Sequence, residues 1–115
     1  MVFCCCCCCC CFRCWHLPVC LCSCHFRRLD GNALFLSKYT RSVGVERCEF
    51  EWIGENAMAT WGATEEYDAT GGEQPRGTRI VGNIAHDVGL YEKQSSGWGQ
   101  SKSCQSTVEG NGARA

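Results

Sequence analysis

A run of eight consecutive cysteines, Cys4 to Cys11, restricts what this chain of 115 residues can fold into. Disulfide-bonded cysteines have Cα atoms about 4.4–6.8 Å apart, whereas neighbours in the chain are only about 3.8 Å apart. The cysteines of the run therefore need partners elsewhere. Twelve of the 14 cysteines lie within residues 4–24, so that only Cys48 and Cys104 lie outside this segment. From this distribution we do not expect an ordered disulfide framework.

The same segment supplies donor atoms for a metal ion. It contains a C-x-x-C pair and the sequence CLCSCH, and thiolate and imidazole groups bind zinc while thiolates also bind Cu(I). Such spacings arise by default in a segment this rich in cysteine, so the pattern by itself is not specific. The candidate metal ligands are Cys11, Cys14, Cys20, Cys22, Cys24 and His25. The sequence indicates no cofactor other than zinc or Cu(I).

The N-terminal segment 1–26 is also apolar enough to suggest contact with a membrane. Cysteine behaves as a small hydrophobic residue, and residues 1–12 carry no charged side chain. A spanning helix needs about 20 mainly apolar residues, and Arg13 near its middle would cost about 2.5–3.5 kcal/mol. Membrane association through residues 1–26, by a span or by a lipid anchor, is therefore the leading specific alternative for the location of the protein.

Beyond residue 28 the chain has few residues for a core. All 13 glycines lie after residue 30, and Leu, Ile, Val and Phe together make up 14 of the 87 residues in 29–115. That share is below the level of about 20% at which charged chains are expected to be disordered, and ordering each backbone residue costs about 1–2 kcal/mol. We therefore expect a mostly disordered or irregular chain without a sizeable core. At best it forms a few short strands in a small, β-poor α+β arrangement. The sequence also allows an apolar N-terminal helix.

Two short segments have the character of strands. Residues 47–53 alternate between apolar and charged side chains, with Phe50 and Trp52 on the apolar face, as in a half-buried strand. Residues 78–84 are a second candidate, weakened by Gly82 in the interior. We find no internal repeat that would stabilise isolated strands by stacking. The predicted organisation is a Cys-rich, low-complexity apolar segment (1–28), a weakly structured segment (29–92) and a flexible polar tail (93–115).

No pattern in the sequence points to catalysis. The chain lacks a G-x-S-x-G elbow, a P-loop, a G-x-G-x-x-G loop and an H-E-x-x-H motif, so we expect no enzyme and assign no catalytic or cofactor-binding residue. No dense stretch of Lys and Arg indicates a nucleic-acid partner. A tract of one residue type is what a repeated codon encodes, and the leading interpretation is an orphan or spurious reading-frame product without a specific activity. The alternative is a small membrane-associated or thiol-rich metal-binding protein that uses its N-terminal cysteines.

Overall fold

A computed structural model describes residues 2–4, 19–64, 68 and 70–114 of the chain. In this part the chain forms twelve short strands and no helix. The strands are β1 (Val2–Cys4), β2 (Val19–Cys22), β3 (Cys24–Leu29), β4 (Leu34–Ser37), β5 (Val43–Glu46), β6 (Glu49–Ile53), β7 (Met58–Trp61), β8 (Arg79–Val81), β9 (Ile84–Val88), β10 (Trp98–Ser101), β11 (Thr107–Glu109) and β12 (Gly112–Arg114). None of the described residues belongs to a helix that is long and apolar enough to cross a membrane.

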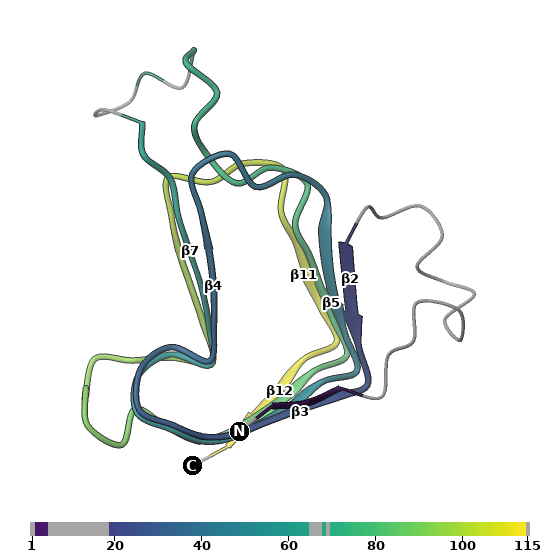
Figure 1. The fold of residues 1–115 in the computed structure, drawn as a ribbon, viewed down its shortest axis with the longest axis vertical. Helices are drawn as coiled ribbons and strands as arrows, with labels where there is room; N and C mark the ends of the chain where they lie inside the picture. The colour runs from purple at the N-terminus through teal and green to yellow at the C-terminus, as the bar shows by residue number, and fades with distance from the viewer. Residues whose placement is uncertain (1, 5–18, 65–67, 69, 115) are drawn as a thin grey trace.

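The strands wind into a parallel β-helix, in which the chain passes through three sheets in turn (Figure 1). The first sheet has the order β2, β5, β8, β11, and the third has the order β4, β7, β10. The second sheet has the order β3, β6, β9, β12, with β1 antiparallel to β3 at its edge. Because Figure 1 looks along the axis of the coil, the strands of one sheet overlap in the view.

Successive turns of the coil repeat the same positions of the fold. Glu49 lies beside His25, Ile84 beside Glu49, and Gly112 beside Ile84, so that the later turns are longer than the first. The connection between β7 and β8 and the connection between β9 and β10 project from the coil and hold the extra residues of the longer turns (Figure 1). The repeat length therefore changes along the chain. The expectation that no repeat stabilises the strands by stacking is wrong.

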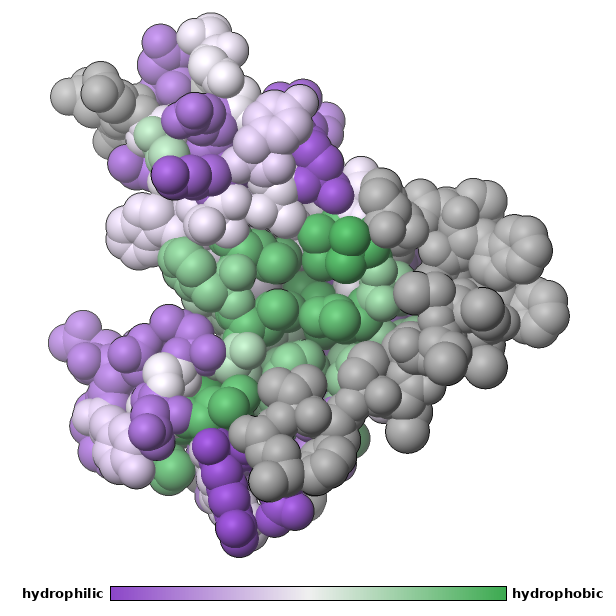
Figure 2. Space-filling model, in the orientation of Figure 1, coloured by the Kyte–Doolittle hydropathy of each residue, from purple (hydrophilic) through white to green (hydrophobic). Residues whose placement is uncertain are grey.

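The core is a stack of apolar side chains that occupy the same position in each turn. The inward-facing sets are Leu21, Val45 and Ile80 in the first sheet, Phe26, Phe50 and Ala85 in the second, and Leu34, Met58 and Trp98 in the third. Phe50, Ile80 and Val45 are completely buried. On the face of the molecule shown in Figure 2, apolar residues gather in the middle, with hydrophilic residues above and below them.

This stack contradicts the predicted fold class. The expectation of a mostly disordered or irregular chain without a sizeable core is wrong, because a low apolar content is enough when the turns stack. Each strand contributes only one or two inward side chains, but the turns above and below cover them. Full burial of a Val, Leu, Ile or Phe side chain stabilises the fold by about 1.5–3 kcal/mol. The fold is an all-β coil and not a small α+β arrangement.

The corner between the first and second sheets uses left-handed backbone in every turn. The equivalent residues are Ser23 (φ 54°), Arg47 (φ 53°), Gly82 (φ 66°) and Gly110 (φ 63°). Glycine adopts this conformation at little cost. The predicted strand 78–84 is therefore two strands, because β8 ends before Gly82 and β9 begins after the corner. Gly82 does not weaken a strand; it turns the chain from one sheet into the next.

A buried amide satisfies the backbone next to this corner. The side chain of Asn83 is 1% exposed; its Oδ1 accepts a hydrogen bond from the Cys48 backbone N–H at 2.8 Å, and its Nδ2 donates to the Val45 carbonyl at 2.9 Å. In the next turn, Asn111 occupies the equivalent position and accepts from the Asn83 backbone N–H at 2.9 Å. These amides join successive turns where the sheet ladders are interrupted.

Three more expectations differ from the structure. Trp52, predicted on the apolar face of residues 47–53, is 38% exposed because the chain turns there with φ 53°, and Ile53 is buried instead. The predicted flexible tail, residues 93–115, contains β10, β11 and β12. The described part of residues 1–28 contains strands and no helix, so the apolar N-terminal helix is absent from that part of the chain.

Candidate functional site

Charged and imidazole side chains gather on the outer face of the second sheet. Phe26, Phe50 and Ala85 point into the core from β3, β6 and β9. Because side chains alternate along a strand, the residues beside these three point outward. The outward residues that form the cluster are His25 and Arg27 from β3, Glu49 and Glu51 from β6, and His86 from β9. We call these five residues the outer-face cluster.

Glu51 is at the centre of the outer-face cluster. Its Oε1 lies 3.1 Å from Nε2 of His25 and 3.0 Å from Nε of Arg27, and its Oε2 lies 3.7 Å from Nε2 of His86. The same Nε2 of His86 lies 3.1 Å from Oε1 of Glu49. Cross-strand pairs of opposite charge stabilise a sheet by about 0.2–1 kcal/mol each, so part of this arrangement supports the coil itself.

His86 is held between two carboxylates. Its Nδ1 lies 3.1 Å from Oδ2 of Asp87, and its Nε2 faces Glu49 at 3.1 Å. The hydrogen bonds to Asp87 and to Glu49 raise the pKa of His86 above its ordinary value, and the nearby charge of Glu51 acts in the same direction. The imidazole side chain is only 13% exposed. Its orientation is therefore fixed from both sides.

The outer-face cluster has the donor set of a transition-metal site. One ligand atom each from His25, Glu49 and Glu51 lie within 4.8 Å of one another. Nε2 of His86 lies 3.1 Å from Glu49 and 3.7 Å from Glu51. Zinc binds His nitrogen and carboxylate oxygen at about 2.0–2.2 Å in a tetrahedral arrangement. The ligand atoms of His25, Glu49 and Glu51 can converge on one such ion with small side-chain movements, and His86 lies next to both glutamates.

Asp87 gives His86 the orientation expected of a metal ligand. Metal-binding histidines usually donate their second ring N–H to a carboxylate or carbonyl, which fixes the tautomer and directs the other nitrogen to the ion. With Nδ1 bound to Asp87 at 3.1 Å, Nε2 of His86 is directed to the two glutamates. Arg27 competes with a cation for Oε1 of Glu51, which leaves Oε2 on the side of His86.

The structure brings only one of the sequence-predicted ligands into this cluster. Cys11 and Cys14 lie outside the described residues. Cys20 and Cys24 each take part in a disulfide, so in this state neither offers a thiolate to an ion. Cys22 is buried, and Cys24 is buried in the core while His25, the next residue, points outward. A metal site built from the cysteine segment stays a prediction.

Sequence reasoning missed the two glutamates and His86. The signal for the glutamates is the repeat that relates the first two turns, because it places Glu49 beside His25 and Glu51 beside Arg27. His86 lies beside Glu51, and the long connection between β7 and β8 separates the two residues in the sequence. The spacing within the sequence does not predict that pairing.

Comparison with protein-family models, with curated proteins and with solved structures finds no match to this chain.

Proposed function

We propose that this protein binds a divalent transition-metal ion, zinc in particular, on the outer face of its second sheet through His25, Glu49, Glu51 and His86. The observation that carries this proposal is the convergence of donor atoms from neighbouring strands, all within 4.8 Å for His25, Glu49 and Glu51. Two imidazoles and two carboxylates form a borderline donor set that suits zinc.

The scaffold supports this function because it fixes the ligands before an ion arrives. Sites on strands are held more precisely than sites on loops, and these four residues stand on three paired strands. Asp87 orients His86 from behind. The proposal takes up metal binding, which was the alternative interpretation of the sequence, but moves the ion from the cysteine segment to the sheet. Membrane association through residues 1–26 remains a separate prediction.

The three histidines of the chain allow a direct test, because they report on two different places. His16 lies within the cysteine segment, whereas His25 and His86 lie in the outer-face cluster. We would titrate the intact protein with Zn²⁺ at about pH 8, where most imidazoles are neutral, and follow the histidine ring signals by NMR. Binding at the sheet shifts the signals of His25 and His86 together and leaves His16 unchanged.

Variants complete the test. Glu49→Gln and His86→Ala each weaken zinc binding about tenfold or more, as loss of a ligand does, whereas Glu92→Gln, an exposed glutamate outside the cluster, leaves binding unchanged. Asp87→Asn also weakens binding, by about 10–100-fold, because it removes the group that orients a ligand.

A histidine shift confined to His16 in the zinc titration would place the ion in the cysteine segment and refute the sheet site. No shift at any histidine would also refute the sheet site, although cysteines alone can bind zinc and the cysteine segment would need a separate test.

A further inference from the structure

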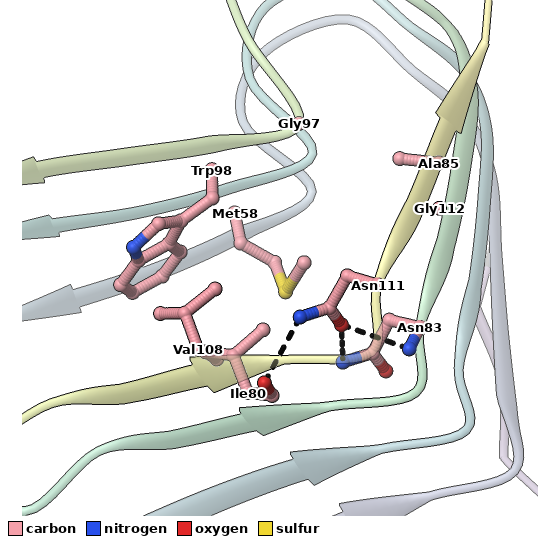
Figure 3. A pocket seen from close by; sticks show the side chains of 9 residues that line it. All are labelled: Met58, Ile80, Asn83, Ala85, Gly97, Trp98, Val108, Asn111 and Gly112. Atoms are coloured by element: carbon pink, nitrogen blue, oxygen red, sulfur yellow. Dashed lines mark hydrogen bonds between the residues drawn. The ribbon is translucent and has the colours of Figure 1, made fainter.

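A pocket lies between the three sheets beside the last described strands, β10, β11 and β12. The last turn contributes β11 to the first sheet and β12 to the second, while in the described residues the third sheet ends one strand earlier, at β10. In the third sheet, Trp98 on β10 is partly buried, and Met58 on the neighbouring strand β7 is buried beside it. Trp98, Met58 and Val108 border the pocket (Figure 3).

The walls of this pocket are apolar. Side chains from all three sheets contribute, namely Ile80 and Val108 from the first, Ala85 from the second, and Met58 and Trp98 from the third. No Asp, Glu, Lys or Arg of the described residues lines the pocket. Its volume is about 160 Å³, close to that of an engineered apolar cavity in another protein, about 150 Å³, which stays dry and binds benzene.

The polar groups at the floor of the pocket are already satisfied by one another. The side-chain amide of Asn111 donates to the carbonyls of Ile80 and Glu109 at 3.0 Å each. Its Oδ1 accepts from the backbone N–H of Asn83 at 2.9 Å and from the Asn83 side chain at 3.0 Å. The two amides therefore have no hydrogen-bonding group left for a ligand. A charged ligand would lose its hydration in the pocket without compensation.

We propose that this pocket binds a small neutral aromatic molecule of one ring. The volume of about 160 Å³ accommodates a single ring. The indole of Trp98 offers a face or edge for aromatic packing, and the thioether of Met58 makes favourable contacts with ring edges. Figure 3 shows both side chains directed to the same space, opposite Val108 and Ile80. This site is independent of the proposed metal site, which lies on the outer face of the second sheet.

The two methionines of the chain provide the measurement. Met58 lines the pocket and Met1 is the other methionine, so labelling the methionine methyl groups with ¹³C yields one signal for each. We would titrate the intact protein with benzene, and separately with benzoate, which carries the same ring and a charge. Benzene shifts the Met58 signal in a saturable manner and leaves Met1 unchanged, and benzoate shifts neither.

A filling substitution tests the location. Val108→Trp places a large side chain in the pocket and weakens benzene binding about tenfold or more. Val19→Trp is its matched control, because Val19 stands on the opposite edge strand of the same sheet and the two valines are similarly exposed, 52% for Val19 and 46% for Val108. The control variant binds benzene as the unmodified protein does, and both substitutions replace exposed side chains, so that folding is retained.

Three outcomes would overturn the proposal. The first is a Met58 signal that benzene does not shift, and the second is an equal response in the Val108→Trp variant. The third is a Met58 signal that shifts with protein concentration in the absence of ligand, together with dimers of the protein in sedimentation. That result would show that a second copy of the chain covers the pocket instead of a small molecule.

Discussion

The rings of Phe26 and Phe50 stack face to face, with centroids 4.7 Å apart and planes 8° apart. The two residues lie side by side in β3 and β6, one full turn of the coil apart. The contact shows how the fold is held together, because each turn buries its inward side chains against the same position of the next. Phe50 is the middle member of its stack, between Phe26 and Ala85.

Phe50→Ala should therefore destabilise the protein strongly. Phe50 is completely buried, and truncation of a buried Phe to Ala costs about 3–5 kcal/mol. Urea unfolding followed by circular dichroism measures the free energy of unfolding. Phe35→Ala is the matched control, since Phe35 is 52% exposed and its loss should change the free energy by less than about 0.5 kcal/mol. Equal effects of the two substitutions would contradict the stacked core.

Gly54→Ala tests the close approach of successive turns. A Cβ atom at Gly54 would collide with the backbone carbonyl of Asp30, in the preceding turn. The backbone must move to admit it, and Gly54 also donates its N–H to the Leu29 carbonyl at 2.7 Å. We expect a loss of about 1–3 kcal/mol or more. Gly31→Ala, where a Cβ would meet nothing within 4 Å, should leave the melting temperature almost unchanged.

The raised pKa of His86 predicts a stability that depends on pH. A group whose pKa is higher in the folded state stabilises the fold fully below its unfolded value, near 6.5, and this contribution is lost as the pH rises through the folded value. The free-energy difference between the unmodified protein and His86→Gln should thus be larger at about pH 5.5 than at about pH 9. The comparison is made with a chelator present.

Asp87→Asn tests whether the hydrogen bond to Asp87 causes this pH dependence. The hydrogen bond to Asp87 contributes most to the raised pKa of His86, so this substitution should lower the pKa of His86 in an NMR titration. An unchanged titration would show that Asp87 does not hold the imidazole in solution.

Cys104 should react faster with alkylating reagents than an ordinary thiol does at neutral pH. The Arg76 Nε–H donates to its sulfur at 3.4 Å, and this hydrogen bond is the largest cause of the lowered pKa of Cys104. More of the thiol is then ionised at neutral pH, and the thiolate is the nucleophile. Arg76→Gln should move the midpoint of the pH–rate profile for iodoacetamide to higher pH, as measured by mass spectrometry of the peptide.

Lys102→Gln is the control for this experiment. It removes a nearby positive charge in the sequence without removing the hydrogen bond to Cys104. An equal shift in both variants would assign the effect to net charge and not to Arg76. Cys48, which is 2% exposed, serves in the same protein as a slowly reacting reference.

Part of the coil can be found in the sequence. When segment 19–33 is aligned with segment 43–57, the two are identical at five positions, namely Val19 and Val43, Cys24 and Cys48, Phe26 and Phe50, Asn32 and Asn56, and Ala33 and Ala57. In the second of the two segments, Val43, Cys48, Phe50 and Ala57 are buried. The match predicts two stacked turns, but a constant repeat does not continue through the longer connections that follow.

The ligands of the candidate metal site were harder to predict from the sequence than the coil was. His25 was a predicted ligand, but its predicted partners were the neighbouring cysteines. Its partners in the structure are Glu49 and Glu51 from the next strand. A search for ligands close in sequence favours residues on the same strand, where alternate side chains face opposite sides of the sheet. Residues a whole turn apart are the ones that share a face.

The sequence by itself determined the local properties of this protein. The alternation around Phe50 makes a half-buried strand, and Gly82 and Gly110 accept the left-handed backbone of a corner at little cost. Only the tertiary structure decided which side chains lie inside the coil and which imidazole meets which carboxylate. The physical reason is that every parallel pairing joins residues a whole turn of the coil apart in the sequence, and neither burial nor charge pairing exists until the turns have stacked.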